Sequence, residues 1–403
     1  RARADEVAVI LTTEQGKPLV EARTEVDTAA DIFDWFAEEA RRTYGRVVPS
    51  RDPAVRQTVL KEPVGPVAAF TPWNFPVSQA ARKIGAALAA GCTMVLKPSE
   101  ETPASTAMLA KVLEEADLPA GVLNLVYGVP AQISSHLIAH PAIRKVSFTG
   151  SVPVGKHLAS LAGLHMKPAT MELGGHAPVL VFADSDVPAV AALMTRSKYR
   201  NAGQVCVSPT RFLVEESVMD TFRAAYVEHA SRLKVGPGLE PGTEMGPLVG
   251  ARRLEAIEAL VSDARERGAK VELGGKRIGN SGYFYEPTVL SRLDRSMRVM
   301  NEEPFGPLAL LIPFRTIDEA LDEANRLPFG LASYAFTASA ATKSVVERGL
   351  QVGMLTINHL GLALPETPFG GVKDSGYGSE GGSEAIEAYL ATKFVSERHV
   401  LRG

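Results

Sequence analysis

The chain has 403 residues, enough at about 150 residues per domain for two to three domains with buried cores. Its 45% hydrophobic content argues against disorder, and a net charge of −3 with no basic run argues against a nucleic-acid-binding protein. The apolar stretch between Lys83 and Lys97 is too short for a membrane span of about 20 residues.

The first half of the chain alternates short apolar runs with helical patterns. A helix is predicted over residues 1–16, ending at Gly16. Strands are then predicted over 64–70, 93–97, 122–126 and 145–149, with helices over 77–90, 104–116 and 131–140 between them. This β-α-β-α order predicts a parallel, doubly wound sheet with helices on both faces.

A second alternating region follows a boundary near Gly174–Gly175. Strands are predicted over 178–182, 211–215, 308–314 and 352–357, and helices over 187–200, 218–233, 252–267 and 317–327. Two segments fit neither region: Val47–Glu62 and Tyr389–Val400 are β-like, and we expect them to pair as a small protruding sheet. The predicted fold class is therefore α/β, with two doubly wound open-sheet domains and a β ribbon.

A glycine-rich turn follows the predicted strand at 145–149. Gly150, Ser151 and Gly155 open a helix, and Lys156 comes next, which nearly matches a nucleoside-triphosphate-binding loop. His157 stands where that loop needs a hydroxyl, which disfavours this interpretation. A turn of this kind at a helix N-terminus still suits a dinucleotide pyrophosphate, although a plain tight turn is an alternative.

The two cysteines have different surroundings. Cys92 lies in an apolar segment and is interpreted as a core residue, whereas Cys206 lies in a loop with Gly, Gln, Ser and Pro neighbours. Two cysteines are too few for a disulfide framework or a cysteine-based zinc site, so we expect no metal centre and a cytoplasmic location.

Two further polar residues sit in rigid, apolar contexts. Glu172 ends a predicted strand before the Gly174–Gly175 pair, where desolvation would raise its pKa and suit it to general-base work. Asn74 lies in the turn Pro72–Pro76, where its amide could stabilise an oxyanion. An ordinary cap or paired glutamate and a simple turn asparagine are the alternatives.

Seven motifs in order together resemble the NAD(P)-dependent aldehyde dehydrogenase superfamily, most closely its succinate-semialdehyde dehydrogenase-like members. They are PWNFP (72–76), KPSE (97–100), FTGS (148–151), MELGG (171–175), NAGQVC (201–206), EEPFGP (302–307) and PFGG (368–371). The resemblance implies a Rossmann-like NAD(P)-binding domain (1–44 and 63–174), a catalytic domain (175–372) and bridging segments (45–62 and 385–403). Members of this family usually carry several dozen residues before the helix that begins this chain, so we expect the chain to be incomplete.

The resemblance implies a covalent mechanism. Cys206 would attack the aldehyde, with Asn74 and the Cys206 backbone N–H holding the oxyanion, and Glu172 would activate the water that hydrolyses the thioester. The implied cofactor-binding residues are Trp73, Lys97, Glu100, Gly150, Ser151, Gly155, Glu303 and Phe305. A carboxylate at Glu100 favours NAD, with NADP as a tolerated alternative.

Two arginines match positions that hold the substrate carboxylate in succinate-semialdehyde dehydrogenases. Arg82 and Arg200 would bind an ω-carboxylated aldehyde through charge-assisted hydrogen bonds, unless each forms an ordinary ion pair. The sequence departs from that subfamily at 363–365, where a serine is missing, and at Ser208, which replaces a second cysteine. A 2-oxoglutarate or glutarate semialdehyde, or a broad aldehyde range, therefore stays open.

Two function alternatives lie in other classes. A non-redox cysteine hydrolase would need a histidine beside Cys206, and His176 is the histidine nearest a motif; a non-catalytic protein would not need Cys206, Glu172 and Asn74 intact. The resemblance implies that the two β-like segments pair subunits into a homodimer or homotetramer, and an unpaired ribbon would also leave an exposed edge. The alternative is a ribbon that folds back on its own subunit.

Overall fold

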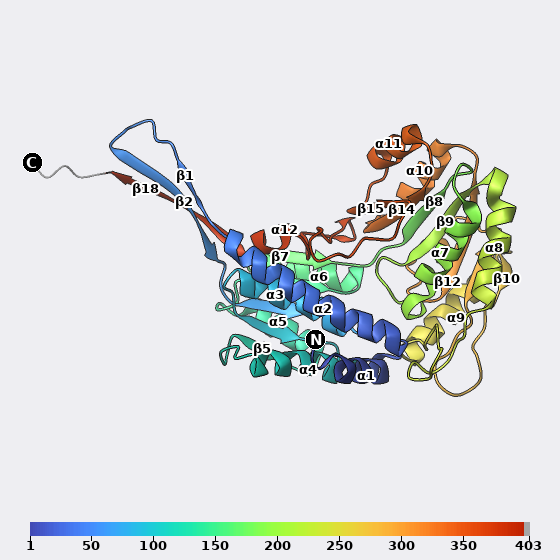
Figure 1. Ribbon diagram of the computed structural model, residues 1–403, viewed down its shortest axis with the longest axis horizontal. Helices are drawn as coiled ribbons and strands as arrows, with labels where there is room; N and C mark the ends of the chain where they lie inside the picture. Colours follow the sequence, from blue (N-terminus) through green and yellow to red (C-terminus); the bar gives the residue numbers. More distant parts are fainter. Residues whose placement is uncertain (399–403) are drawn as a thin grey trace, which may run out of the picture.

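The computed structural model describes residues 1–398. Its chain forms two large sheets, each covered by helices, and a three-stranded ribbon that projects from one end (Figure 1). Within the described residues, no helix is both long and apolar enough to cross a membrane.

The first large sheet has six strands in the order β17-β7-β6-β3-β4-β5. They are β3 (Val67–Phe70), β4 (Met94–Lys97), β5 (Leu123–Leu125), β6 (Lys145–Thr149), β7 (Ala169–Glu172) and β17 (Gly376–Tyr377). Neighbouring strands run parallel except β17, which pairs antiparallel with β7. The chain therefore returns to this sheet after it has built the second one.

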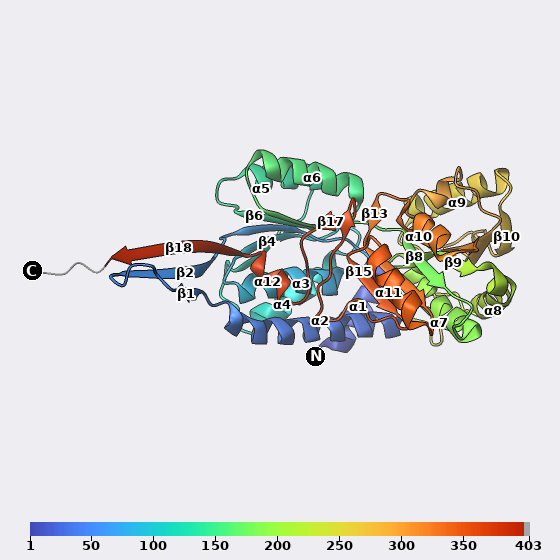
Figure 2. The same cartoon turned by 90° about the horizontal axis from the view of Figure 1, so that it is seen from above.

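Helices cover both faces of this sheet (Figure 2). On one face lie α1 (Ala4–Gln15), α2 (Leu19–Glu39), α3 (Pro76–Ala89) and α4 (Pro103–Glu115), and on the other lie α5 (Pro130–Ala139) and α6 (Val152–Leu164). Each face has its own buried apolar cluster, and β3 contributes to both because its four residues are all buried. This is the pattern that parallel strands covered on two sides require.

The second large sheet has seven strands in the order β10-β11-β12-β9-β8-β14-β15. They are β8 (Ala177–Val181), β9 (Pro209–Glu215), β10 (Lys270–Leu273), β11 (Thr288–Ser291), β12 (Leu308–Phe314), β14 (Ala332–Phe336) and β15 (Met354–Ile357). One apolar cluster joins it to α7 (Val187–Tyr199), α8 (Met219–Ser231) and α9 (Ala251–Glu266). A second cluster joins its other face to α10 (Ile317–Asn325) and α11 (Ala340–Gly349).

The ribbon consists of β1 (Arg46–Val48), β2 (Val55–Pro63) and β18 (Leu390–Arg398). β2 and β18 pair antiparallel along their full length, with Val59 opposite Phe394. The short elements β13 (Phe329–Gly330), β16 (Val372–Lys373) and α12 (Glu384–Glu387) complete the chain, with 3₁₀ turns at 40–42, 200–203, 216–218 and 298–300.

The predicted α/β class, with two doubly wound sheets and a β ribbon, is confirmed. The two β-like segments do pair, although 399–403 of the expected bridging segment lie outside the described residues. The strand predicted from Val64 begins at Val67, because Gly65 adopts a φ of 111° and interrupts the extended backbone. The sequence analysis did not predict α2, β10, β11, β14 or α11. The residue ranges assigned to domains stay a prediction.

Candidate active site

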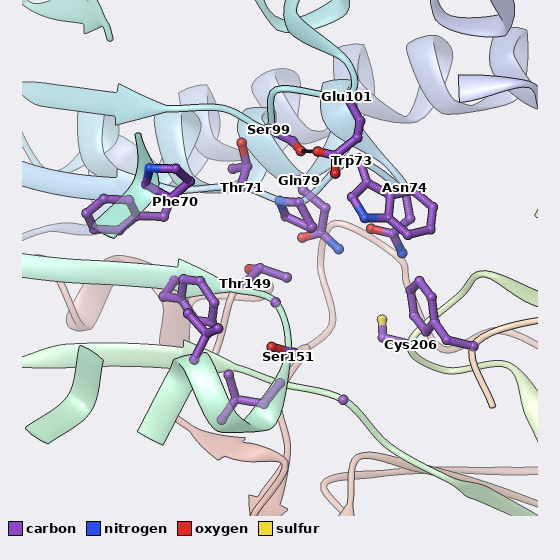
Figure 3. A pocket seen from close by; sticks show the side chains of 18 of the residues that line it. Phe70, Thr71, Trp73, Asn74, Gln79, Ser99, Glu101, Thr149, Ser151 and Cys206 are labelled. Carbon is purple, nitrogen blue, oxygen red and sulfur yellow. Dashed lines mark hydrogen bonds between the residues drawn. The ribbon is translucent and has the colours of Figure 1, made fainter. Parts of the chain in front are cut away.

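A cavity of about 970 Å³ lies at the carboxyl ends of the first sheet's parallel strands, the edge where open α/β sheets bind ligands (Figure 3). Its wall combines residues that follow β3, β4, β6 and β7 with Cys206, the start of α9 and the segment after 302. Of the thirteen predicted site residues, ten line it: Trp73, Asn74, Lys97, Glu100, Gly150, Ser151, Glu172, Cys206, Glu303 and Phe305.

Cys206 is held at the cavity wall by a constrained loop. Asn201 and Ala202, just before it, adopt left-handed backbone conformations with φ of 50° and 52°, which is strain of the kind found at functional sites. A side chain at Gly203 would meet the Gly306 carbonyl at 2.1 Å, so glycine is required there. Burial, followed by the charges of nearby glutamates, raises the pKa of the Cys206 thiol to about 12.

Asn74 faces the same part of the cavity as the Cys206 sulfur (Figure 3). Its Nδ2 donates one hydrogen bond to the Gln204 carbonyl at 3.1 Å, which ties the turn after β3 to the cysteine loop. The second Nδ2 hydrogen is left to donate to a ligand, because an amide nitrogen carries two. The arrangement can therefore hold an oxyanion formed beside Cys206.

Glu172 ends β7 and is buried, with both carboxylate oxygens lacking a hydrogen-bond partner in the described part of the chain. Burial, and then the charge of Glu380, raises its pKa well above the usual range, while Lys83 and Arg82 oppose this shift. An unpartnered carboxylate of raised pKa that lines a cavity is suited to take a proton from water.

The far end of the cavity carries the predicted adenosine and pyrophosphate contacts. Lys97 and Glu100 form an ion pair of 2.7 Å at the end of β4. Ser151 immediately precedes α6, and a side chain at Gly150 would clash with the Phe148 ring at 2.5 Å. This segment can therefore offer free backbone N–H groups of a helix N-terminus to a phosphate.

Gly155 lies outside the cavity lining, and its role as a cofactor-binding residue stays a prediction. A Cβ on it would lie 2.2 Å from Cδ2 of Leu173. Gly155 therefore lets α6 approach the end of β7, which sets the position of the helix N-terminus.

The remaining wall brings Glu303 and Phe305 beside the cysteine loop. Glu303 Oε1 accepts a hydrogen bond from the Gly175 N–H at 3.1 Å, and burial raises its pKa to about 7. The rings of Phe305 and Trp73 meet edge to face, with centroids 5.5 Å apart, and Phe305 adopts a strained φ of 44°. These groups line the same cavity as Cys206.

The comparison with known families decides the identity. Residues 1–395 match the description "Aldehyde dehydrogenase family". The chain belongs to this family. It is therefore an enzyme that oxidises aldehydes, and the resemblance read from the seven motifs is confirmed.

Relatives with assigned names and solved structures agree with this membership. A 4-(hydroxymethyl)benzenesulfonate dehydrogenase of Comamonas testosteroni is 51% identical, over 98% of this chain and 82% of the relative. A 3-sulfolactaldehyde dehydrogenase of Pseudomonas putida is 44% identical, over 97% of this chain and 80% of the relative. The crystal structure of a succinate-semialdehyde dehydrogenase from Burkholderia pseudomallei superposes with a TM-score of 0.97 at 44% identity, over 99% of this chain and 83% of that one.

The two arginines predicted to bind substrate in this aldehyde dehydrogenase, Arg82 and Arg200, lie outside the cavity lining and in different environments. Arg82 is buried on α3, and its terminal nitrogens donate to the Ala363 carbonyl at 2.7 Å and the Glu380 carbonyl at 3.1 Å. Arg200 is exposed and lies over the Phe75 ring at 5.2 Å. Their role as substrate ligands stays a prediction.

Several charged residues at the site were not found from the sequence. Lys83 on α3 forms a buried ion pair with Glu380, beside Glu172. Lys198 on α7 donates to the Ser208 hydroxyl at 3.0 Å, and burial lowers its pKa to about 7. No motif marks these residues, and the partner of Lys83 lies 297 positions away in the chain.

His176 does not serve as a base for Cys206. Its Nδ1 contacts the Thr210 hydroxyl at 2.6 Å and its Nε2 contacts the Val299 carbonyl at 3.0 Å, so both ring nitrogens are occupied. Burial lowers its pKa well below the usual range, which keeps the ring neutral. The non-redox cysteine hydrolase alternative is accordingly not favoured.

Proposed function

We propose that this aldehyde dehydrogenase uses NAD to oxidise an aldehyde that carries a terminal anionic group, through a thioester on Cys206. The observation that carries the proposal is the convergence of Cys206, Asn74, Glu172 and Glu303 in one cavity. The ion pair of Lys97 with Glu100 lines the same cavity at its other end. A cavity of about 970 Å³ also fits the size range of cofactor sites.

The residues present fit a nicotinamide dinucleotide. The start of α6 would hold the pyrophosphate, Lys97 and Glu100 the adenosine ribose, and Glu303 and Phe305 the nicotinamide ribose and ring. The supporting observations are that Gly150 and the other four residues line the cavity, and that Gly155 lets α6 pack closely against Leu173. Bound there, the cofactor supplies a hydride acceptor next to the carbon that Cys206 attacks.

The protein's own residues would carry the remaining chemistry. The Cys206 thiol loses its proton to solvent, and the resulting thiolate adds to the aldehyde carbon. The Asn74 amide and the Cys206 backbone N–H hold the oxygen that becomes negative. Loss of hydride leaves a thioester. Glu172 then takes a proton from water, the resulting hydroxide attacks the thioester carbonyl, and the acid leaves as the Cys206 thiolate is released.

Cofactor preference is proposed from Glu100. Its carboxylate can accept hydrogen bonds from a ribose 2′-hydroxyl, and it repels a 2′-phosphate. Lys97, 2.7 Å from Glu100, offsets part of that repulsion, so NADP is expected to bind more weakly rather than not at all.

The substrate class is proposed from the two arginines and from what the relatives' names share. Arg200 is exposed and close enough to Cys206 to lower the pKa of its thiol, and Arg82 is charged beside Glu172. The three named relatives act on compounds that carry a sulfonate or a carboxylate. An aldehyde with a distal carboxylate or sulfonate would complement this positive field.

NADH formation over a panel of aldehydes tests the proposal. We expect succinate semialdehyde or a sulfonated aldehyde to exceed propanal in kcat/KM by at least tenfold. Arg200→Met should remove most of this advantage, because it raises KM for the anionic aldehydes and leaves kcat/KM for propanal unchanged. A higher kcat/KM for propanal in the wild type would overturn the substrate class but not the aldehyde dehydrogenase chemistry.

Assembly into a homodimer or homotetramer is proposed from the ribbon. β18 is exposed along almost its whole length, and Phe394 is a large apolar side chain that is 58% exposed. An edge strand of this kind is a ready surface for pairing with a second copy. Gel filtration of the wild type and of Phe394→Glu tests this, with monomeric wild type as the contrary outcome.

A further inference from the structure

A buried ion pair lies beneath the turn that carries Asn74. Lys17, in the link between α1 and α2, contacts Glu25 on α2 at 2.5 Å, and the two residues are only 1% and 4% exposed. Burying two charges is costly, so a pair of this kind is weak evidence of stabilisation. What the pair holds in place indicates its role.

Both members of the pair bind backbone groups of the turn and of the helix that follows it. Lys17 Nζ donates to the Asn74 carbonyl at 2.7 Å and lies 3.9 Å from the centre of the Phe75 ring. The second oxygen of Glu25 accepts the N–H groups of Val77 and Ser78, in the first turn of α3, at 2.9 and 3.1 Å. The pair thus fixes the backbone on both sides of Asn74.

The same helix also holds the cysteine loop. Glu21, one helical turn before Glu25, accepts the Asn201 N–H at 2.8 Å. The Asn201 side chain donates to the Asn74 carbonyl at 3.1 Å and to the Gln204 carbonyl at 3.2 Å. One face of α2 therefore links the turn after β3 to the strained loop before Cys206.

The link from α1 to α2 is itself packed against the second half of the molecule. Leu19 N–H donates to the Gly238 carbonyl at 2.9 Å, and side chains at Gly238 or Gly246 would collide with the carbonyls of Lys17 and Gly16. Lys17 therefore occupies a position fixed by both halves, from which it can set one relative to the other.

We propose that the Lys17–Glu25 pair is a positioning device that sets the Asn74 amide at the distance from Cys206 that oxyanion stabilisation requires. The inference rests on the proposed role of Asn74. Displacement of a donor by about 1 Å can cost a hundredfold in rate, and the pair bonds directly to the Asn74 carbonyl.

A double-mutant cycle on the full-length protein tests the inference. Lys17→Met, Glu25→Gln, Asn74→Ala and the combinations with Asn74→Ala are compared by kcat for aldehyde oxidation and by cofactor-free hydrolysis of p-nitrophenyl acetate. We expect Lys17→Met to lower both rates about 10- to 100-fold in the wild-type background, and less than about threefold when Asn74 is already alanine. The dissociation constant for NAD, from quenching of tryptophan fluorescence, should change less than about threefold.

Controls separate positioning from simple destabilisation. Glu323→Gln removes a comparably buried carboxylate on α10, which is paired with Arg295 at 2.9 Å, Arg326 at 3.0 Å and Arg211 at 3.4 Å and is not a cavity residue. It should lower the unfolding midpoint without lowering kcat. If Lys17→Met does not fold, Glu25→Gln, which keeps nearly the same shape, serves for the cycle.

The possible failures are distinguishable. Equal fold-losses from Lys17→Met with and without Asn74 would overturn the inference, as would an unchanged kcat in a folded Lys17→Met or Glu25→Gln protein. Unchanged rates in Asn74→Ala would instead overturn the proposed oxyanion role, and the inference with it.

Discussion

Replacing Arg82 with methionine tests whether this buried guanidinium holds the segment 363–380, which contributes Phe369 to the cavity wall. The variant keeps a long apolar stem but removes the donors to the Ala363 and Glu380 carbonyls. It also removes the contact of the guanidinium with the Phe369 ring, 5.1 Å away. Phe369 lines the cavity, so disorder in this loop should reach the site.

The expected cost follows from these contacts. A buried carbonyl left without a donor costs about 1–3 kcal/mol, which applies to Glu380. Ala363 is exposed, so its carbonyl can regain water and contributes little. The lost stacking on Phe369 adds about 0.5–2 kcal/mol. Burial of the guanidinium is itself costly, as its lowered pKa shows, and the substitution removes this cost. The net loss in the free energy of unfolding is therefore about 2 kcal/mol.

Urea unfolding followed by tryptophan fluorescence measures this loss. Trp35 on α2 and Trp73 after β3 both report on the first sheet and its helices. Arg82→Met should lower the midpoint and reduce kcat for neutral and anionic aldehydes alike, and the lost charge beside Glu172 should in addition raise KM for anionic aldehydes. Arg200→Met should leave the midpoint unchanged. An unchanged midpoint for Arg82→Met, with a raised KM for anionic aldehydes only, would refute the loop-anchor reasoning.

Three other outcomes are expected. Gly155→Ala forces a Cβ to within 2.2 Å of Leu173, so stability should fall by about 1–3 kcal/mol and NAD should bind several-fold more weakly by fluorescence titration; unchanged binding would contradict the packing argument. Alkylation of Cys206 by iodoacetamide should rise about tenfold per pH unit from 7 to 10, because its pKa is raised to about 12 and only the thiolate reacts; a plateau below pH 9 would contradict the shift, and Cys206→Ser, which keeps the buried Cys92, is the control. Glu100→Ser should raise kcat/KM for NADP relative to NAD about tenfold, and an unchanged ratio would remove the basis for NAD preference.

The buried charges of the site share one physical cause. Glu172 and Glu303 have raised pKa values and Lys198 has a lowered one, and in each case desolvation is the largest contribution. Burial thereby shifts each group toward its neutral form, and it brings the pKa values of Glu303 and Lys198 to about 7. Clusters of this kind are typical of active sites and are costly elsewhere.

Much of the fold and the centre of the site could be predicted from the sequence. Short apolar runs separated by helical patterns dictate parallel strands covered on both faces. In a parallel sheet the carboxyl ends of all strands meet at one edge, so residues that follow separate strands, such as Asn74, Ser151 and Glu172, were bound to converge. The motif around Cys206 added the nucleophile, which approaches that edge from the second sheet.

The tertiary structure alone decided what lies behind these residues. The sequence of α2 is too polar to have been singled out as a helix. Its Glu21 and Glu25 nevertheless bind the two loops of the site. Arg82 was expected to face substrate, and its terminal nitrogens bind two backbone carbonyls. Such roles depend on which N–H and carbonyl groups remain unpaired once distant loops are packed, and no local pattern encodes that. The sequence by itself determined the reacting groups, and long-range packing determined how they are held.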